Sequence, residues 1–140
     1  MQECADKHAA EALFVSRFIV RQRRDRVLHE LLHPRKRCRC IWDITAVGND
    51  RLAPQRIHEL PQSVAPETVM AMLRVRGCLE DDPVYVLCGG EIFDARTMPL
   101  HEALACLWPY PPFVILHKAS GTALTAGESG GYAPWLALLY

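Results

Sequence analysis

The chain has 140 residues and a mass of 15.8 kDa, half of its residues are hydrophobic, and its 16 basic and 16 acidic residues balance. This length argues for one compact domain over residues 1–140, and the apolar fraction together with the zero net charge excludes a disordered tail. A chain of this size buries roughly two-thirds of its unfolded surface, so it needs neither a disulfide nor a metal ion in order to fold.

The first half of the chain, over residues 9–76, is predicted to be helical. Residues 9–32 contain no glycine or proline and their apolar residues recur at helical spacing, which predicts one long amphipathic helix that Pro34 ends. A proline at the first position and a glycine after the last predict a shorter helix over 66–76. Between these helices, residues 40–46 fit a short strand by their alternation of apolar and polar residues, whereas the resemblance described below favours a helix.

The second half of the chain, over residues 84–140, is predicted to be rich in strands. Proline opens a helix over 100–107, and the remaining apolar segments are short and separated by glycine and proline turns. Helices followed by strands indicate an α+β fold, in which the long N-terminal helix and further helices pack on a mainly antiparallel sheet of three to five strands from the second half. The predicted strands are 84–88, 92–93, 112–117, 122–125 and 132–140.

One motif in the second half has a recognisable pattern. It consists of Asp94, Arg96, Met98-Pro99-Leu100 and Glu102-Ala103-Leu104, and it follows Arg76-Gly77 and the strand at 84–87. From about residue 28 onward, the chain resembles a family of small uncharacterised bacterial proteins that carry Asp-Gly-Arg-x-Met-Pro-Leu-x-Glu-Ala-Leu at a helix start. Ala95 stands where the family has glycine, Cys88 where it has serine, and Ser120 where it has proline. The resemblance implies the fold and transfers no activity.

Basic residues are concentrated in one segment. Residues 17–39 hold nine basic and two acidic residues, a net charge of +7 within a neutral chain. Arginine side chains suit phosphate and carboxylate groups, so the segment is a candidate surface for nucleic acid or an acidic partner. A solvated helix balanced by the acidic remainder of the chain explains the same pattern. The candidate surface residues are Arg21, Arg23, Arg24, Arg35, Lys36, Arg37 and Arg39.

Four potential metal ligands lie in a stretch of twelve residues, 29–40, that overlaps this basic segment. His29 and His33 are one helical turn apart, and Cys38 and Cys40 follow them, which is a ligand set that a tetrahedral zinc site can use. The cysteine spacing is shorter than in most zinc pairs, and Pro34 redirects the chain between the two halves. Surface histidines and partly buried thiols are therefore the preferred interpretation, and we expect no metal and no cofactor.

Four further residues are candidates for a ligand pocket at the strand ends: Cys88, Asp94, Arg96 and His117. Cys88 and His117 each end a predicted strand, so a thiol and an imidazole could meet there as nucleophile and base. Asp94 and Arg96 are two residues apart in a predicted extended stretch and could address one polar ligand. Core packing of Cys88 and an ion pair that fixes the loop explain the same residues without a ligand.

No complete catalytic motif is visible in the sequence. We therefore expect a small non-catalytic binding or protein-interaction module whose partner is a protein or a small ligand. The alternatives are a small enzyme that uses the pocket above and nucleic-acid binding through residues 17–39. Residues 1–12 lack the apolar run of an export signal, and no apolar stretch reaches the roughly 20 residues of a membrane helix. These features predict a cytoplasmic protein with reduced cysteines and no membrane contact.

Overall fold

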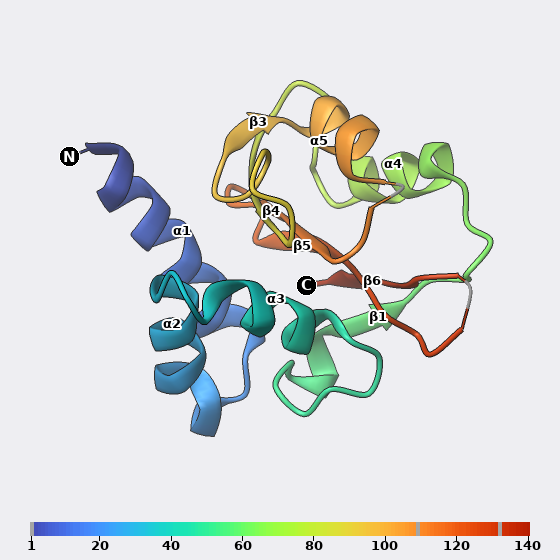
Figure 1. The fold of residues 1–140 in the computed structure, drawn as a ribbon. Helices are drawn as coiled ribbons and strands as arrows, with labels where there is room; N and C mark the ends of the chain where they lie inside the picture. The colour runs from blue at the N-terminus through green and yellow to red at the C-terminus, as the bar shows by residue number, and fades with distance from the viewer. Residues whose placement is uncertain (1, 109, 132) are drawn as a thin grey trace.

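A computed structural model describes residues 2–108, 110–131 and 133–140, with side chains from residue 5 onward. At its centre is a six-stranded antiparallel sheet with the strand order β1-β6-β5-β4-β2-β3 (Figure 1). The strands are β1 (Ile57–Glu59), β2 (Pro83–Cys88), β3 (Thr97–Pro99), β4 (Phe113–His117), β5 (Thr122–Gly127) and β6 (Trp135–Leu139).

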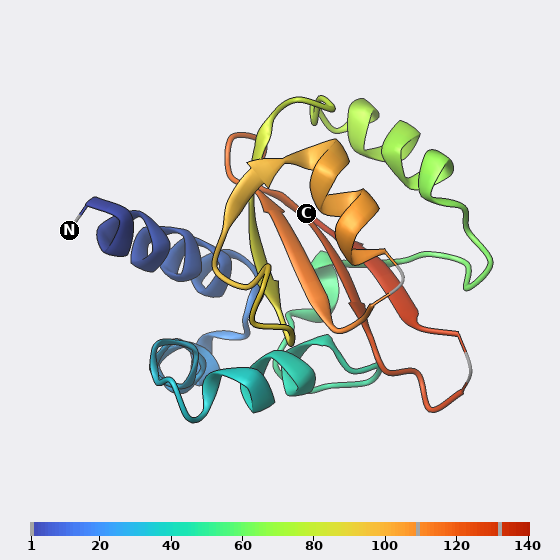
Figure 2. The ribbon, with the colours of Figure 1, turned by 45° about the horizontal axis from the view of Figure 1, so that its top comes forward.

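Helices cover both faces of this sheet, so the fold has three layers (Figure 2). On one face lie α1 (Gln2–Phe18), α2 (Arg24–Leu32) and α3 (Arg37–Thr45), and on the other lie α4 (Pro66–Val75) and α5 (Leu100–Leu107). Short 3₁₀ turns at Arg21–Arg23 and Pro54–Arg56 complete the described helical segments.

The side chains of β2 show how the sheet is buried on both faces. Tyr85 and Leu87 pack into the core beneath α1, α2 and α3, whereas Val84, Val86 and Cys88 pack beneath α4 and α5. Successive side chains of a strand point to opposite faces, so a strand covered on both sides needs an unbroken apolar run. This requirement explains why 84–88 is apolar throughout instead of alternating with polar residues.

The predicted long N-terminal helix is interrupted. Ile19 forms an antiparallel bridge with Leu52, and the backbone N–H of Val20 donates to the Arg51 carbonyl at 2.8 Å. The chain therefore leaves the helical conformation between α1 and the 3₁₀ turn, although no glycine or proline marks the break. Pairing with a segment 33 residues away overrides the local helical preference, which is a weak determinant.

The predicted number and origin of the strands also need correction. The sheet has six strands instead of three to five, because β1 comes from the first half of the chain and pairs with β6. Residues 92–93 lie in a turn, and the strand that follows β2 is β3 at Thr97–Pro99. Residue 132, where the last predicted strand was expected to begin, lies outside the described residues.

Other expectations are confirmed. The α+β class and the antiparallel sheet are as predicted, α5 spans the predicted residues 100–107, and α4 ends one residue before the predicted boundary. Residues 40–45, for which the sequence left both strand and helix open, are helical in α3. No helix within the described ranges combines the length and the apolar character that are needed to cross a membrane.

Candidate functional site

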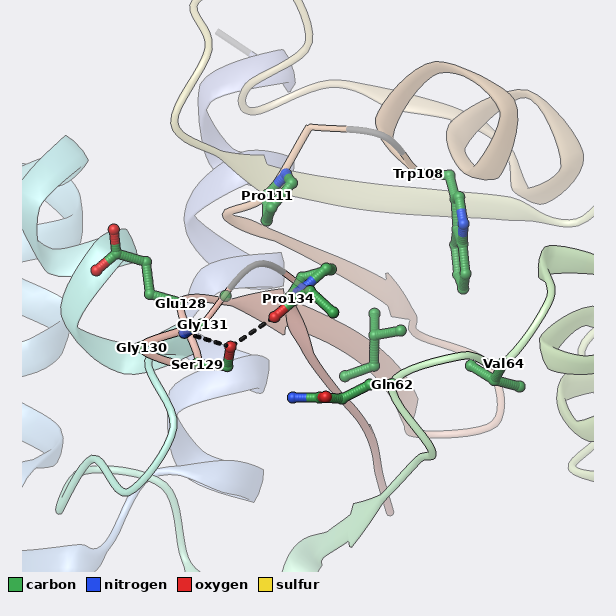
Figure 3. A pocket seen from close by; sticks show the side chains of 12 residues that line it. Gln62, Val64, Trp108, Pro111, Glu128, Ser129, Gly130, Gly131 and Pro134 are labelled. Carbon is green, nitrogen blue, oxygen red and sulfur yellow. Dashed lines mark hydrogen bonds between the residues drawn. The ribbon is translucent and has the colours of Figure 1, made fainter.

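A cavity of about 570 Å³ lies at the end of the sheet where β5 ends and β6 begins. Three segments supply the described residues of its walls: the loop 127–134 without residue 132, Gln62 and Val64 after β1, and Trp108 and Pro111 between α5 and β4. In Figure 3 the Trp108 ring extends from the end of α5 toward Val64, and the Gln62 side chain points toward Ser129.

Glycines shape the loop that forms one wall of this cavity. A Cβ atom on Gly127 would lie 1.9 Å from the Thr45 carbonyl oxygen, so only glycine allows the end of α3 to approach β5 this closely. Gly130 has a φ of +81°, in the left-handed region that favours glycine. The Ser129 hydroxyl donates to the Ala133 carbonyl at 2.5 Å and fixes the turn. The loop is thus built from local requirements of the backbone.

The lining of the cavity combines apolar surface with a few polar groups. Trp108, Val64 and Leu136 supply apolar contacts, and the Gln62 amide can both donate and accept hydrogen bonds. Glu128 is the one charged residue among the described residues of the lining. The Ser129 hydroxyl is occupied within its own turn, and no histidine lines the described part of the cavity, so the arrangement provides binding groups and lacks a nucleophile with its base.

The four predicted ligand residues do not form one pocket. The backbone N–H of Cys88 donates to Asp94 Oδ1 at 3.1 Å, so these two residues are neighbours at the end of β2. His117 lies at the opposite end of the sheet, because Cys88 pairs with Phe113, the first residue of the antiparallel strand that His117 ends. Arg96 is exposed and lines a different cavity of about 440 Å³ between α1 and β3. The structure therefore does not bring the Cys88 thiol and the His117 imidazole together.

A β-bulge separates Asp94 from Arg96. Ala95 donates its N–H to the Val86 carbonyl at 2.8 Å, and Val86 donates its own N–H to the Arg96 carbonyl at 2.9 Å. Ala95 and Arg96 therefore both lie opposite Val86, which is the pattern of a β-bulge. Ala95 has a φ of 58°, which is uncommon for a residue other than glycine. The extended geometry that would point Asp94 and Arg96 the same way is absent at this described position.

Asp94 belongs to a buried ion cluster with Arg37, Glu11 and Tyr85. The Arg37 guanidinium donates to Asp94 at 2.6 and 3.0 Å and to both Glu11 oxygens at 2.7 and 2.8 Å. The Tyr85 hydroxyl donates to the same Glu11 carboxylate. The Glu11 side chain is 3% exposed and the Arg37 side chain 16%. Arg37 is therefore a largely buried ion-pair residue, unlike the exposed basic residues with which it was grouped.

The cluster fixes the charge state of its members. Burial lowers the pKa of Arg37, but the hydrogen bonds with Asp94 and Glu11 outweigh this effect and raise the pKa above its ordinary value. Burial raises the pKa of Tyr85, and the hydrogen bond to the Glu11 carboxylate raises it further. Arg37 consequently stays charged and Tyr85 stays neutral at physiological pH. The cluster ties α1 and α3 to β2 and to the loop that follows it.

His117 belongs to a second hydrogen-bonded group, with Asp82 and Ser120. Its Nε2 lies 2.8 Å from Asp82 Oδ2 and its Nδ1 lies 2.7 Å from Ser120 Oγ. The Ser120 N–H also donates to Nδ1, so we assign the ring proton to Nε2, from which it is donated to Asp82. The hydrogen bond from the backbone N–H of Leu79 lowers the pKa of Asp82, and the hydrogen bond from His117 lowers it further. Serine, histidine and aspartate also form hydrolase triads, in which the histidine likewise bonds through both nitrogens, but the His117 side chain is only 5% exposed, so a substrate has little access to it. This group holds the β4–β5 turn against the loop before β2.

The potential zinc ligands do not converge. The Cys38 thiol contacts the Gly89 carbonyl at 3.8 Å, whereas the Cys40 thiol contacts the Val27 carbonyl at 3.9 Å. Residues two apart on a helix point about 200° apart, which explains the divergence. In the part of the chain that the structure describes, no group of three or more histidine, cysteine, aspartate or glutamate side chains could hold a metal ion.

The other basic residues of the segment 17–39 serve different purposes. Arg23 pairs with Asp50 at 2.6 Å, and Arg24 Nε donates to the Ile19 carbonyl at 3.0 Å. Arg21, Arg35 and Lys36 are exposed, and among the described residues their side chains have neither a hydrogen-bonded nor a charged partner. Arg39 is also exposed and lies 3.9 Å from Asp43. Part of the local positive charge is thus neutralised, and part of it faces solvent.

Comparison with known proteins adds no assignment, since no protein-family model, no curated protein and no solved structure matches the chain. The cavity beside the loop 127–134 was missed by sequence reasoning. The available signal was a glycine-rich turn after the predicted strand 122–125 and a corner of tryptophan and prolines before the predicted strand 112–117. Gln62 and Val64 carried no such signal, because only the pairing of β1 with β6 brings the residues after β1 to this loop.

Proposed function

We propose that this chain is a non-catalytic binding module that holds a short segment of a partner protein in the cavity beside the loop 127–134. The observation that carries the proposal is the cavity itself, with a volume of about 570 Å³ and an open, mixed lining. Its size is within the range of specific binding sites, which are mostly apolar with a few polar groups that fix orientation.

The lining matches a peptide better than it matches a substrate to be transformed. Trp108 and Val64 offer apolar surface for one side chain, and the Gln62 amide and the loop backbone offer donors and acceptors for a peptide backbone. The Glu128 carboxylate, which is exposed, favours a basic residue in the partner segment. The ligand expected from these groups is a short extended peptide with one bulky apolar and one basic residue.

Exposed apolar side chains next to the cavity support a macromolecular partner. Val47 is 44% exposed and its backbone N–H donates to the Glu128 carbonyl. Tyr110, 72% exposed, precedes Pro111 of the lining in the chain and itself lines another cavity with Ile92 and Phe93. Aromatic residues at the edge of a pocket are typical of protein interfaces. A small ligand enclosed in the cavity would leave these two side chains uncovered.

A random-sequence peptide library displayed on phage tests the proposal. Peptides enriched on the wild-type protein should share an apolar and a basic residue, and their binding should shift the backbone amide NMR signals of Gly130 and Gly131. Trp108→Ala should weaken binding at least about tenfold. Leu79→Ala, which removes an exposed apolar side chain at the opposite end of the sheet, should leave the affinity unchanged. The proposal is refuted if no peptide is enriched, or if the enriched peptides shift amides elsewhere and bind the Trp108 variant equally well.

A further inference from the structure

A second concave site lies between α2 and α3, away from the cavity described above. It has a volume of about 300 Å³, and the two helices that form it meet at the turn that joins them (Figures 1 and 2). It is lined by Arg26, Glu30, Arg35, Lys36, Arg39, Cys40, Asp43 and Arg51.

This lining carries an excess of positive charge. Five of its residues are basic and two are acidic, which gives a net charge of +3. Both carboxylates already have partners, because Glu30 accepts from Arg26 at 3.1 Å and Asp43 contacts Arg51 at 3.0 Å. Burial is the main reason why the pKa of the Cys40 thiol is raised to about 12, and the negative charge of Glu30 is the second reason. Cys40 therefore stays neutral. The positive charge of the cavity is therefore not balanced by its own residues.

Several donors in the cavity have no acceptor in the protein. Arg35 and Lys36 have neither hydrogen-bonded nor charged partners among the described residues, and Arg39 reaches Asp43 only at 3.9 Å. Arg51, whose side chain is 17% exposed, is already paired, since its Nη1 lies 3.0 Å from Asp43 Oδ2. The Arg35 and Lys36 side chains therefore have donors that are available to bind an anion.

We propose that this cavity binds the phosphate group of a small phosphate ester through Arg35, Lys36 and Arg39. Guanidinium groups bind phosphate oxygens in pairs of parallel hydrogen bonds, and lysine adds a further donor. This site is independent of the peptide cavity and of the function proposed for it.

The surroundings favour a small ligand over a nucleic acid. Binding of a nucleic-acid backbone requires positive charge along an extended surface. Here the neighbouring basic residues are already bonded, Arg23 to Asp50, Arg24 to a backbone carbonyl and Arg37 to buried carboxylates. The unpaired positive charge at the turn between α2 and α3 comes from Arg35 and Lys36, and both residues line the one cavity of about 300 Å³.

Calorimetric titration with inorganic pyrophosphate at constant ionic strength tests the site. The wild-type chain should bind one pyrophosphate, and Lys36→Ala and Arg39→Ala should each weaken binding about tenfold. Arg21→Ala is the matched control, because Arg21 is an exposed, unpaired arginine of the same segment that does not line the cavity. Its affinity should stay within about twofold of the wild type.

Each contrary outcome overturns the inference. Absence of saturable pyrophosphate binding at millimolar concentration would remove the site, and equal weakening by Arg21→Ala would show general electrostatic attraction. A single-stranded oligonucleotide that competes with pyrophosphate and whose affinity also depends on Arg21 would replace the small-ligand site with a nucleic-acid surface. Thermal melts of the three variants keep the comparison valid, since the three substituted side chains are exposed and their loss should leave the melting temperature nearly unchanged.

Discussion

Replacing Arg37 by alanine should destabilise the protein severely. The substitution removes five hydrogen bonds, two to Asp94, two to Glu11 and one to the Leu31 carbonyl. It also leaves the Glu11 carboxylate, 3% exposed, buried with only the Tyr85 hydroxyl as its hydrogen-bonded partner in the described structure. Removing one partner of a buried ion pair costs about 3–5 kcal/mol, which for a chain of this size corresponds to a fall of roughly 10–20 °C in melting temperature.

Denaturant unfolding, followed by circular dichroism, measures this loss of stability. Two further variants show whether the loss comes from the unpaired buried carboxylate. Arg23→Ala removes the same side chain from the exposed pair with Asp50, so it should cost at most about 1 kcal/mol. The double variant Arg37→Met with Glu11→Leu should be more stable than Arg37→Met alone, because the unpaired buried carboxylate is gone. If Arg37→Ala unfolds within about 1 kcal/mol of the wild type, the cluster is not the interior link described above.

Three further predictions concern backbone geometry and titration. Gly127→Ala should cost more than about 2 kcal/mol in denaturant unfolding, because its Cβ would collide with the Thr45 carbonyl oxygen, whereas Gly131→Ala, with only a 3.7 Å contact, should be nearly neutral. Ala95→Gly should be neutral or stabilising by up to about 1 kcal/mol, because it relieves a left-handed conformation, and a clear loss of stability in the same assay would contradict the bulge. The folded-state pKa of Asp82 is below its ordinary value of 3.8, so its contribution to stability is present above that pH and is lost as the pH falls toward the folded-state value. The melting temperature of Asp82→Asn should therefore fall less steeply than that of the wild type between about pH 4 and pH 2.5.

The elements that the sequence predicted well are those whose signals are local. Proline and glycine mark the ends of α4 and α5, and the apolar run 84–88 marks a strand that is buried on both faces. The errors arise where pairing with a distant segment decides the conformation. Residue 19 leaves the helix because it bridges to residue 52, and β1, only three residues long, is a strand because β6 lies beside it. Neither partner can be inferred from the spacing of residues within the segment itself.

The buried ion cluster shows what a closer inspection of the sequence could have found. Arg37 is indistinguishable from its basic neighbours by local pattern, since its partners come from residues 11 and 94. Glu11 differs, because Phe14, Val15 and Phe18 follow it at the spacings that place four side chains on one buried helix face. A carboxylate at such a core position requires a hydrogen-bonded or charged partner, because burial of an unpaired charge is too costly for a stable fold. The sequence therefore contained evidence that Glu11 has an interior hydrogen-bonded or charged partner, and the three-dimensional arrangement was needed to identify Arg37 and Tyr85.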